Sequence, residues 1–76
     1  MLAVQSHARL GTLVATSDAM AAIPRDALSR AVRCHAYARC IEGEPFRTRH
    51  SWEGVVFYLR TDGGRSETTI WLEEER

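Results

Sequence analysis

The closing third of the chain, residues 52–76, alternates apolar and polar residues on both sides of the pair Gly63-Gly64. This alternation predicts a β-hairpin, because glycine readily adopts the positive φ that a two-residue hairpin turn requires. Pairing outward from the turn gives one apolar face: Leu59 opposite Thr68, Phe57 opposite Ile70, and Val55 opposite Leu72. The other face pairs Arg60 with Glu67, Tyr58 with Thr69, and Val56 with Trp71. One register thus sorts apolar side chains to one side and pairs opposite charges on the other, which fixes the fold expected for this half of the chain.

Signals upstream of the hairpin predict a strand, a short helix, a long helix and a second strand. They cover residues 9–15, 18–22, 24–41 and 46–51. Thr16-Ser17-Asp18 offers an N-cap, Pro24 suits the first turn of the long helix, and Gly43 suits its end. We therefore expect residues 1–76 to form a single α+β domain, with one main helix packed on a mostly antiparallel sheet of three or four strands.

The 3.6-residue period divides the long helix into an apolar stripe and an arginine-rich side. We expect the stripe to face the sheet with Ala27, Leu28, Ala31, Cys34, His35, Ala38 and Ile41. The sheet residues expected to meet it are Phe46, Val55, Phe57, Leu59, Ile70 and Leu72. The final residues 73–76 read as a solvated tail.

The composition of the chain argues against some classes of function. Ten acidic and ten basic residues give zero formal net charge, which argues against a dedicated nucleic-acid binder. All ten bases are arginine, a bias that we attribute to codon usage in a GC-rich bacterial genome. No window resembles a membrane span or a secretory signal, so we expect a cytoplasmic protein without membrane contact. Cys34 and Cys40 both fall in the predicted long helix, too far apart to bridge while it is intact, and we expect both thiols to be reduced.

Part of the sequence resembles a group of short, uncharacterised proteins of bacterial plasmids and other mobile elements. Their closing segment has the form G-V-x-F-W/Y-I-x-T-E-x-x-R-S-x-T-T-I/V-L-L-P-E-E. Its first half is matched by residues 54–62, and its second half, without a gap, by Arg65-Ser66, Thr68-Thr69-Ile70, Leu72 and Glu74-Glu75. Residues 10–16 resemble the opening L-G-x-L-V-A-T of the group. The middle departs from it, since the R-H-A-x-G-D-W-G segment of many members has no counterpart here. The resemblance implies a mobile-element origin, such as a plasmid or gene cassette, and no catalytic residues.

The sharpest candidate site lies on the sheet face turned away from the expected core. A two- or four-residue turn after the strand at 46–51 places on that face Arg47, Arg49, Tyr58, Arg60 and Trp71. Arginines interleaved with aromatic rings suit single-stranded nucleic acid, by phosphate pairing and base stacking. Val56 beside Trp71 favours instead an apolar contact with a second subunit, and an inert solvated surface is the third interpretation.

Histidines and cysteines offer weaker candidates. His35 lies on the apolar stripe and reads as a hydrogen-bonded core histidine, while His50 falls on the core side near a turn and could reach His35 or Cys34. The sequence does not decide whether these three residues are functional or belong to the core. The chain has no C-x-x-C or H-x-x-x-H pair and no G-x-S-x-G elbow, so we expect no metal, no cofactor and no nucleophile.

Two function hypotheses follow. The first is a non-enzymatic accessory or interaction protein of a bacterial mobile element that associates with copies of itself. The second is a toxin-like, metal-independent ribonuclease or RNA-binding protein that uses the arginine and tyrosine face, with His50 if the turn inverts the strand. The first is favoured, and with it self-association over nucleic-acid binding.

Overall fold

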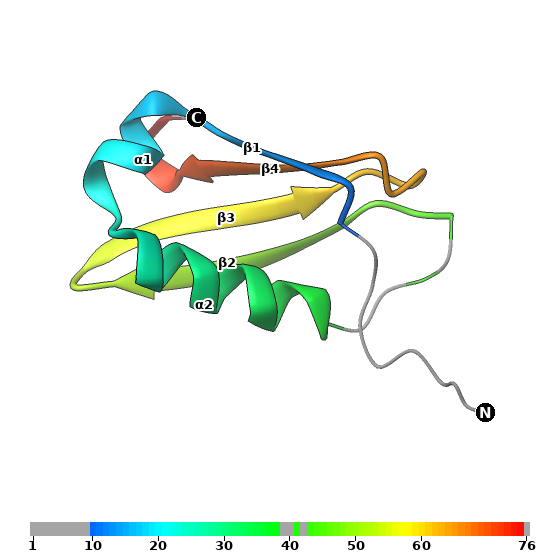
Figure 1. Cartoon of the computed structure of the whole chain (residues 1–76), viewed down its shortest axis with the longest axis horizontal. Coiled ribbons are helices and arrows are strands. Elements are labelled where there is room, and N and C mark those ends of the chain that lie inside the picture. Colours follow the sequence, from blue (N-terminus) through cyan, green and yellow to red (C-terminus); the bar gives the residue numbers. More distant parts are fainter. Residues whose placement is uncertain (1–9, 39–40, 42, 76) are drawn as a thin grey trace.

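The computed structural model describes residues 10–38, 41 and 43–75 of the chain. The elements follow one another as β1 (Thr12–Ala15), α1 (Ser17–Ala22), α2 (Arg25–Ala36), β2 (Phe46–Trp52), β3 (Val55–Thr61), β4 (Glu67–Leu72) and the 3₁₀-helix η1 (Glu73–Glu75) (Figure 1). The expected first strand reached back to Arg9, which lies outside the described residues. The strands form one mixed sheet in the order β1-β4-β3-β2, in which β1 runs parallel to β4 and the other pairs are antiparallel. The expected α+β fold is confirmed.

The core lies between the two helices and one face of the sheet. Its buried members are Ala19, Ile23, Ala27 and Ala31 from the helical layer and Phe57, Leu59, Ile70 and Leu72 from β3 and β4. The chain leaves β1 at one edge of the sheet, passes through both helices, and returns at the other edge as β2 (Figure 1). Neither α1 nor α2 covers the opposite face of the sheet, called here the open face.

The long helix ends earlier than expected. Thr16 caps α1 by accepting a hydrogen bond from the Ala19 N–H, as the sequence indicated. Helix α2, however, ends at Ala36 and not at Ile41, because the N–H groups of Tyr37 and Ala38 bond the carbonyls three residues back and close the last turn tightly. Ile41 is consequently 67% exposed instead of buried.

The face that α2 turns to the sheet is narrower than expected. Ala27, Ala31 and His35, spaced four residues apart, are buried against it. Cys34 points out of the core and is exposed, so the prediction that it fills the core is wrong. Leu28 packs against the core as a half-buried residue.

A two-residue turn connects β2 to β3. Glu53 and Gly54 both have positive φ, 49° and 83°, as a type I′ hairpin turn requires. The turn makes Trp52 and Val55 direct partners, so the register continues as His50 with Phe57 and Arg49 with Tyr58. An even loop keeps the arginines of β2 on the open face, as the sequence predicted.

The β3–β4 hairpin closes differently from the expectation. Its pairs are Thr61 with Thr68, Arg60 with Thr69, Leu59 with Ile70, Tyr58 with Trp71, and Phe57 with Leu72. The predicted partners were therefore wrong by two residues. Because two is the side-chain period of a strand, every side chain nevertheless stays on its predicted face.

Asp62 explains the longer loop. Its carboxylate accepts hydrogen bonds from the Ser66 hydroxyl, the Ser66 N–H and the Glu67 N–H, and those bonds hold the pKa of Asp62 below its usual value. Within the loop Arg65 takes the positive φ of 59°, and neither Gly63 nor Gly64 does. Gly63 instead serves close packing, since a Cβ there would lie 2.5 Å from the Gly43 carbonyl oxygen.

The acidic end of the chain is part of the fold, which corrects the prediction of a solvated tail. The Glu75 carboxylate accepts hydrogen bonds from the Leu72 N–H at 2.6 Å and from the Thr16 hydroxyl at 2.8 Å. The Glu73 carboxylate accepts one from the Tyr58 hydroxyl at 3.0 Å. These bonds join η1 to the start of α1 and to the open face. Arg76 lies outside the described residues.

Candidate functional site

The five residues predicted to share the open face do share it. They form what we call the basic cluster: Arg47 and Arg49 on β2, Tyr58 and Arg60 on β3, and Trp71 on β4. Arg49, Tyr58 and Trp71 stand in one row across three strands, and Arg47 and Arg60 are direct partners in the next row. The type I′ turn and the even register shift of the second hairpin together produce this arrangement.

The aromatic residues of the basic cluster are stacked and oriented. The Tyr58 and Trp71 rings lie 5.7 Å apart, centroid to centroid, with 27° between their planes. The Arg47 guanidinium carbon lies 5.4 Å from the centre of the Tyr58 ring, within the range of a cation–π contact. The Tyr58 hydroxyl donates to Glu73, which fixes the ring from its far end. The cluster is thus a semi-rigid aromatic surface with a cation on it.

Within the part of the chain that the structure describes, the arginines of the basic cluster form no ion pairs. The predicted partner of Arg60 was Glu67, but Arg60 lies between Arg47 and Thr69. Among residues 10–38, 41 and 43–75 no carboxylate forms an ion pair with Arg47, Arg49 or Arg60, although the charge of Arg60 does help to lower the pKa of Asp62. All three guanidinium groups are exposed. They remain available to an anionic ligand.

The expected direct pairing of Val56 with Trp71 is absent. Val56 lies opposite Ser51 and not opposite Trp71, and both apolar residues are half-buried. The exposed apolar side chains of the sheet are instead Leu13, at 50%, and Val14, at 40%, on the edge strand β1.

A chain of polar side chains crosses the core face of the sheet beneath the helices. His50 Nε2 lies 2.7 Å from Thr48 Oγ1, which lies 2.6 Å from His35 Nδ1. His35 Nε2 lies 2.8 Å from Thr61 Oγ1, which lies 2.6 Å from Thr68 Oγ1. The Thr68 hydroxyl donates to the carbonyl oxygen of Leu10 at 2.7 Å. We call the five side chains the histidine–threonine chain.

The Leu10 carbonyl is the last acceptor of the histidine–threonine chain, and it determines which hydroxyl groups donate and which accept. The Leu10 carbonyl can only accept, so Thr68 donates to it and must accept from Thr61. Thr61 then accepts from the Nε2–H of His35, which leaves Nδ1 to accept from the Thr48 hydroxyl. Thr48 in turn accepts from the Nε2–H of His50. In this arrangement a neutral His35 carries its proton on Nε2, and His50 donates through its own Nε2–H.

Burial supports the neutral state of both rings. His35 is fully buried and stacks on Phe46 at 4.4 Å, with 15° between the ring planes. Desolvation, aided by the nearby His50, lowers the pKa of His35 to about 4. Desolvation also lowers the pKa of His50. The interpretation of His35 as a hydrogen-bonded core histidine is confirmed.

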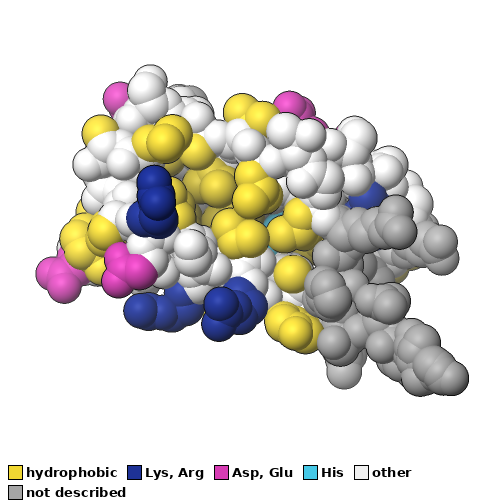
Figure 2. All heavy atoms as spheres, viewed as in Figure 1, with side chains coloured by type: hydrophobic (Ala, Val, Ile, Leu, Met, Phe, Trp, Pro, Cys, Tyr) yellow, Lys and Arg dark blue, Asp and Glu magenta, His cyan; other side chains and the backbone are white. Residues whose placement is uncertain are grey.

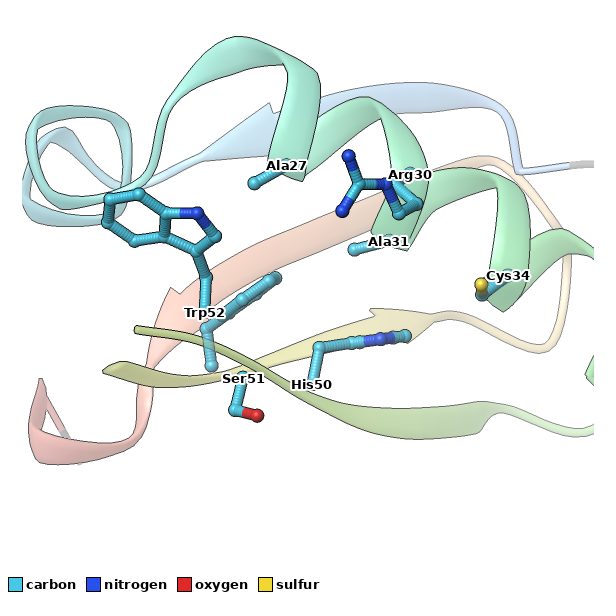
Figure 3. Close-up of a pocket in the computed structure, with 8 residues that line it drawn as sticks. Ala27, Arg30, Ala31, Cys34, His50, Ser51 and Trp52 are labelled. Carbon is cyan, nitrogen blue, oxygen red and sulfur yellow. The ribbon is translucent and has the colours of Figure 1, made fainter. Parts of the chain in front are cut away.

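A pocket of about 130 Å³ lies where α2 meets β2, and we call it the α2–β2 pocket (Figure 3). Ala27, Ala31 and Phe57 give it an apolar lining. His50 and Trp52 reach it from β2, and Arg30 and Cys34 from α2, while the Ser51 side chain points away (Figure 3). The pocket exists because alanines occupy the helix positions above it and fill little space.

Cys34 and His50 both line the pocket, as one sequence interpretation proposed, whereas His35 does not line it and is linked to His50 through the Thr48 hydroxyl. The structure groups no three His, Cys, Asp or Glu side chains of residues 10–38, 41 and 43–75 into a metal site. Cys40 and Arg39 lie outside the described residues.

Sequence reasoning missed the threonines and the pocket. Thr48, Thr61 and Thr68 all occupy core-facing strand positions, and a buried hydroxyl needs a partner. That pattern was visible in the alternation and pointed to a buried histidine. Arg30 and Trp52 gave no such signal, because their meeting depends on how α2 crosses β2.

No helix of the described residues is long and apolar enough to cross a membrane. No known protein family, curated protein or solved structure matches the chain.

Proposed function

We propose that this protein is a non-enzymatic binding protein whose open sheet face holds single-stranded nucleic acid. The observation that carries the proposal is the basic cluster, in which three exposed arginines that form no ion pair with any described residue surround the stacked rings of Tyr58 and Trp71. Guanidinium groups pair with phosphates, and a base stacked on an aromatic side chain contributes about 1–3 kcal/mol. Zero net charge does not by itself oppose this, because Arg47, Arg49 and Arg60 are gathered on one face of the sheet, where Glu73 bonds the Tyr58 hydroxyl.

The arrangement supports binding over cleavage. A metal-independent ribonuclease needs a group that moves a proton beside the phosphate, most often histidine. Both described histidines lie on the core face, on the side of the sheet opposite Arg47, Arg49 and Arg60. In the toxin-like hypothesis His50 joins the arginine and tyrosine face only if the turn inverts β2, and the type I′ turn does not invert it.

The test is a titration of labelled single-stranded RNA, followed by fluorescence anisotropy at several salt concentrations. We expect the double substitution Arg47→Ala, Arg49→Ala to weaken binding at least tenfold. Loss of two phosphate contacts should also reduce the salt slope by about 1.4, at roughly 0.7 per contact for single strands.

The matched control removes two arginines from α2, Arg25→Ala and Arg33→Ala, and keeps the same net charge as the test variant. Both control residues are exposed and lie outside the basic cluster. Equal losses in the two double variants would indicate attraction by overall charge, and an unchanged affinity in the first would refute the proposal.

A second candidate, self-association, has an observation of its own. The edge strand β1 exposes Leu13 on one side and Val14 on the other, and an apolar edge strand invites pairing with another strand. Either activity fits the role of an accessory protein of a bacterial mobile element, which the sequence resemblance implies and which we retain as part of the proposal.

Light scattering after gel filtration over a concentration series tests self-association. We expect a dimer or larger assembly that persists at high salt and dissociates in Leu13→Glu. A monomer at high micromolar concentration would exclude this candidate and leave the first one standing.

A further inference from the structure

The α2–β2 pocket has the features of a site for a small planar ligand. Ala27, Ala31 and Phe57 give it an apolar part, and its volume of about 130 Å³ lies between the helix and the edge strand and opens to solvent. The rest of the lining comes from Arg30, Cys34, His50 and Trp52, and from Ser51, whose side chain points away (Figure 3). An apolar cavity with a few converging polar groups is the usual form of a small-molecule site.

Three of those polar groups have hydrogen-bonding capacity that the fold does not use. Within the described part of the chain, the Arg30 guanidinium and the Trp52 indole N–H donate no hydrogen bond. His50 uses its Nε2–H on Thr48, which leaves Nδ1 as an acceptor. The pocket therefore offers two kinds of donor and one acceptor, together with the flat surface of the Trp52 indole and that of the His50 imidazole, which already stacks on Phe57 at 5.5 Å between ring centroids.

The pocket also lies next to two basic surfaces. Arg47 and Arg49 alternate with Thr48 and His50 along β2, so the same strand carries the basic cluster on one face and a pocket wall on the other. On the other side of the pocket, Arg25, Arg30 and Arg33 line a shallow hollow along α2. Figure 2 shows arginines along the lower margin of the helical face, where α2 runs.

We propose that the α2–β2 pocket binds one nucleobase, stacked against Trp52 and His50, with Arg30 contacting its carbonyl oxygen or the attached phosphate. This deepens the proposed function, since a strand held on the open face could pass around the edge of β2 and place one nucleotide in the pocket. The ligand chemistry is that of a nucleotide, supplied either by a single strand or as a free mononucleotide.

Nuclear magnetic resonance separates the two sites, because the chain has one tryptophan at each. The indole N–H signals of Trp52 and Trp71 are assigned with Trp52→Phe and Trp71→Phe. The probes are the four nucleoside 5′-monophosphates and a short single-stranded RNA. We expect at least one mononucleotide to shift the Trp52 signal saturably and leave Trp71 unmoved, while RNA shifts both.

Arg30→Gln should weaken the mononucleotide effect at least fivefold. Its matched control is Arg25→Gln, which removes the same charge from the same helix at a residue that does not line the pocket. Thermal unfolding of both variants verifies that the fold is kept.

The outcomes separate the two proposals. RNA shifts confined to Trp71, with no mononucleotide effect on Trp52, would overturn the pocket assignment and leave the open face as the binding surface. A mononucleotide effect on Trp52 without RNA binding would overturn the proposed function and keep the pocket as a nucleotide site. Equal losses in Arg30→Gln and Arg25→Gln would reduce the effect to general attraction and overturn the pocket assignment.

Discussion

The two faces of the sheet use polar residues in opposite ways. On the core face, His35, Thr61 and Thr68 are fully buried and pass hydrogen bonds from one to the next until the last is accepted by a backbone carbonyl. On the open face, Arg47 and Arg49 are exposed and make no ion pair within the described residues. Polar groups that hold a fold are those with complete hydrogen bonding, and groups with unused capacity are the ones available to a ligand.

The largest loss of stability is expected at His35, on the core face of the sheet. Replacing it with alanine removes a buried ring and leaves Thr48 and Thr61 without their shared partner. We expect His35→Ala to lower the free energy of unfolding by about 3–4 kcal/mol, measured by urea denaturation. Arg49→Ala on the open face is the control and should change stability by less than about 0.5 kcal/mol. A loss below about 1 kcal/mol at His35 would contradict the idea that polar groups of the core face stabilise the fold more than those of the open face.

Acid should destabilise the protein through the same residue. The folded pKa of His35, about 4, lies below the ordinary value of 6.5, so the unfolded chain binds its proton first. Stability from this group is complete above pH 6.5 and declines as the pH falls towards 4, by on the order of 3 kcal/mol in all. Denaturation between pH 7.5 and 4 measures the decline. His35→Gln should reduce the decline and leave the part that belongs to His50, whose pKa is also lowered by burial, and an equal slope in that variant would assign the effect to other groups.

Two threonines provide a matched pair across the sheet. Thr61 is fully buried in the histidine–threonine chain, whereas Thr69 is half-buried on the open face. Thr61→Val should cost about 1–3 kcal/mol, because the isosteric change leaves the His35 Nε2–H and the Thr68 hydroxyl with one partner fewer. Thr69→Val should be within about 0.5 kcal/mol of the original protein. Similar losses of stability at both positions would show that hydrogen bonds on the core face stabilise the fold no more than those on the open face.

A substitution at Tyr58 should have the smallest effect on stability, and it distinguishes a structural role of this residue from a role in ligand binding. Tyr58→Phe keeps the stack on Trp71 and loses the hydrogen bond to Glu73. We expect a stability loss of about 0.5–1.5 kcal/mol, measured by thermal unfolding, and RNA affinity within about twofold. A large fall in affinity with little change in stability would show that the hydroxyl contacts the ligand directly.

Local patterns predicted the α+β fold and the membership of the basic cluster. Alternation with period two places a residue on one face or the other whatever its partner, so Tyr58 and Arg60 were placed correctly although both were paired wrongly. Cross-strand pairing depends on loop length, which the Asp62 hydrogen bonds decide. For that reason the Arg60–Glu67 pair was predicted and is absent.

Helix length and core membership were less predictable. The apolar stripe continued to Ile41, yet the helix ends at Ala36, where the chain closes a tight turn and leaves towards β2. Cys34 and His35 are neighbours in sequence, and about 100° of rotation between them separates an exposed residue from a buried one. The angle at which α2 meets the sheet selects between them.

Short-range periodicity and turn residues such as Glu53-Gly54 were enough to predict the order of the elements. They were also enough to predict that one face of the sheet is apolar and the other carries arginines. Only the tertiary structure decided that His35 joins Thr48, Thr61 and Thr68 in one hydrogen-bonded chain, and that Arg30 and Trp52 meet around a pocket. A face follows from the geometry of one strand, whereas a contact between elements follows from how they pack, and packing is settled by all the side chains together.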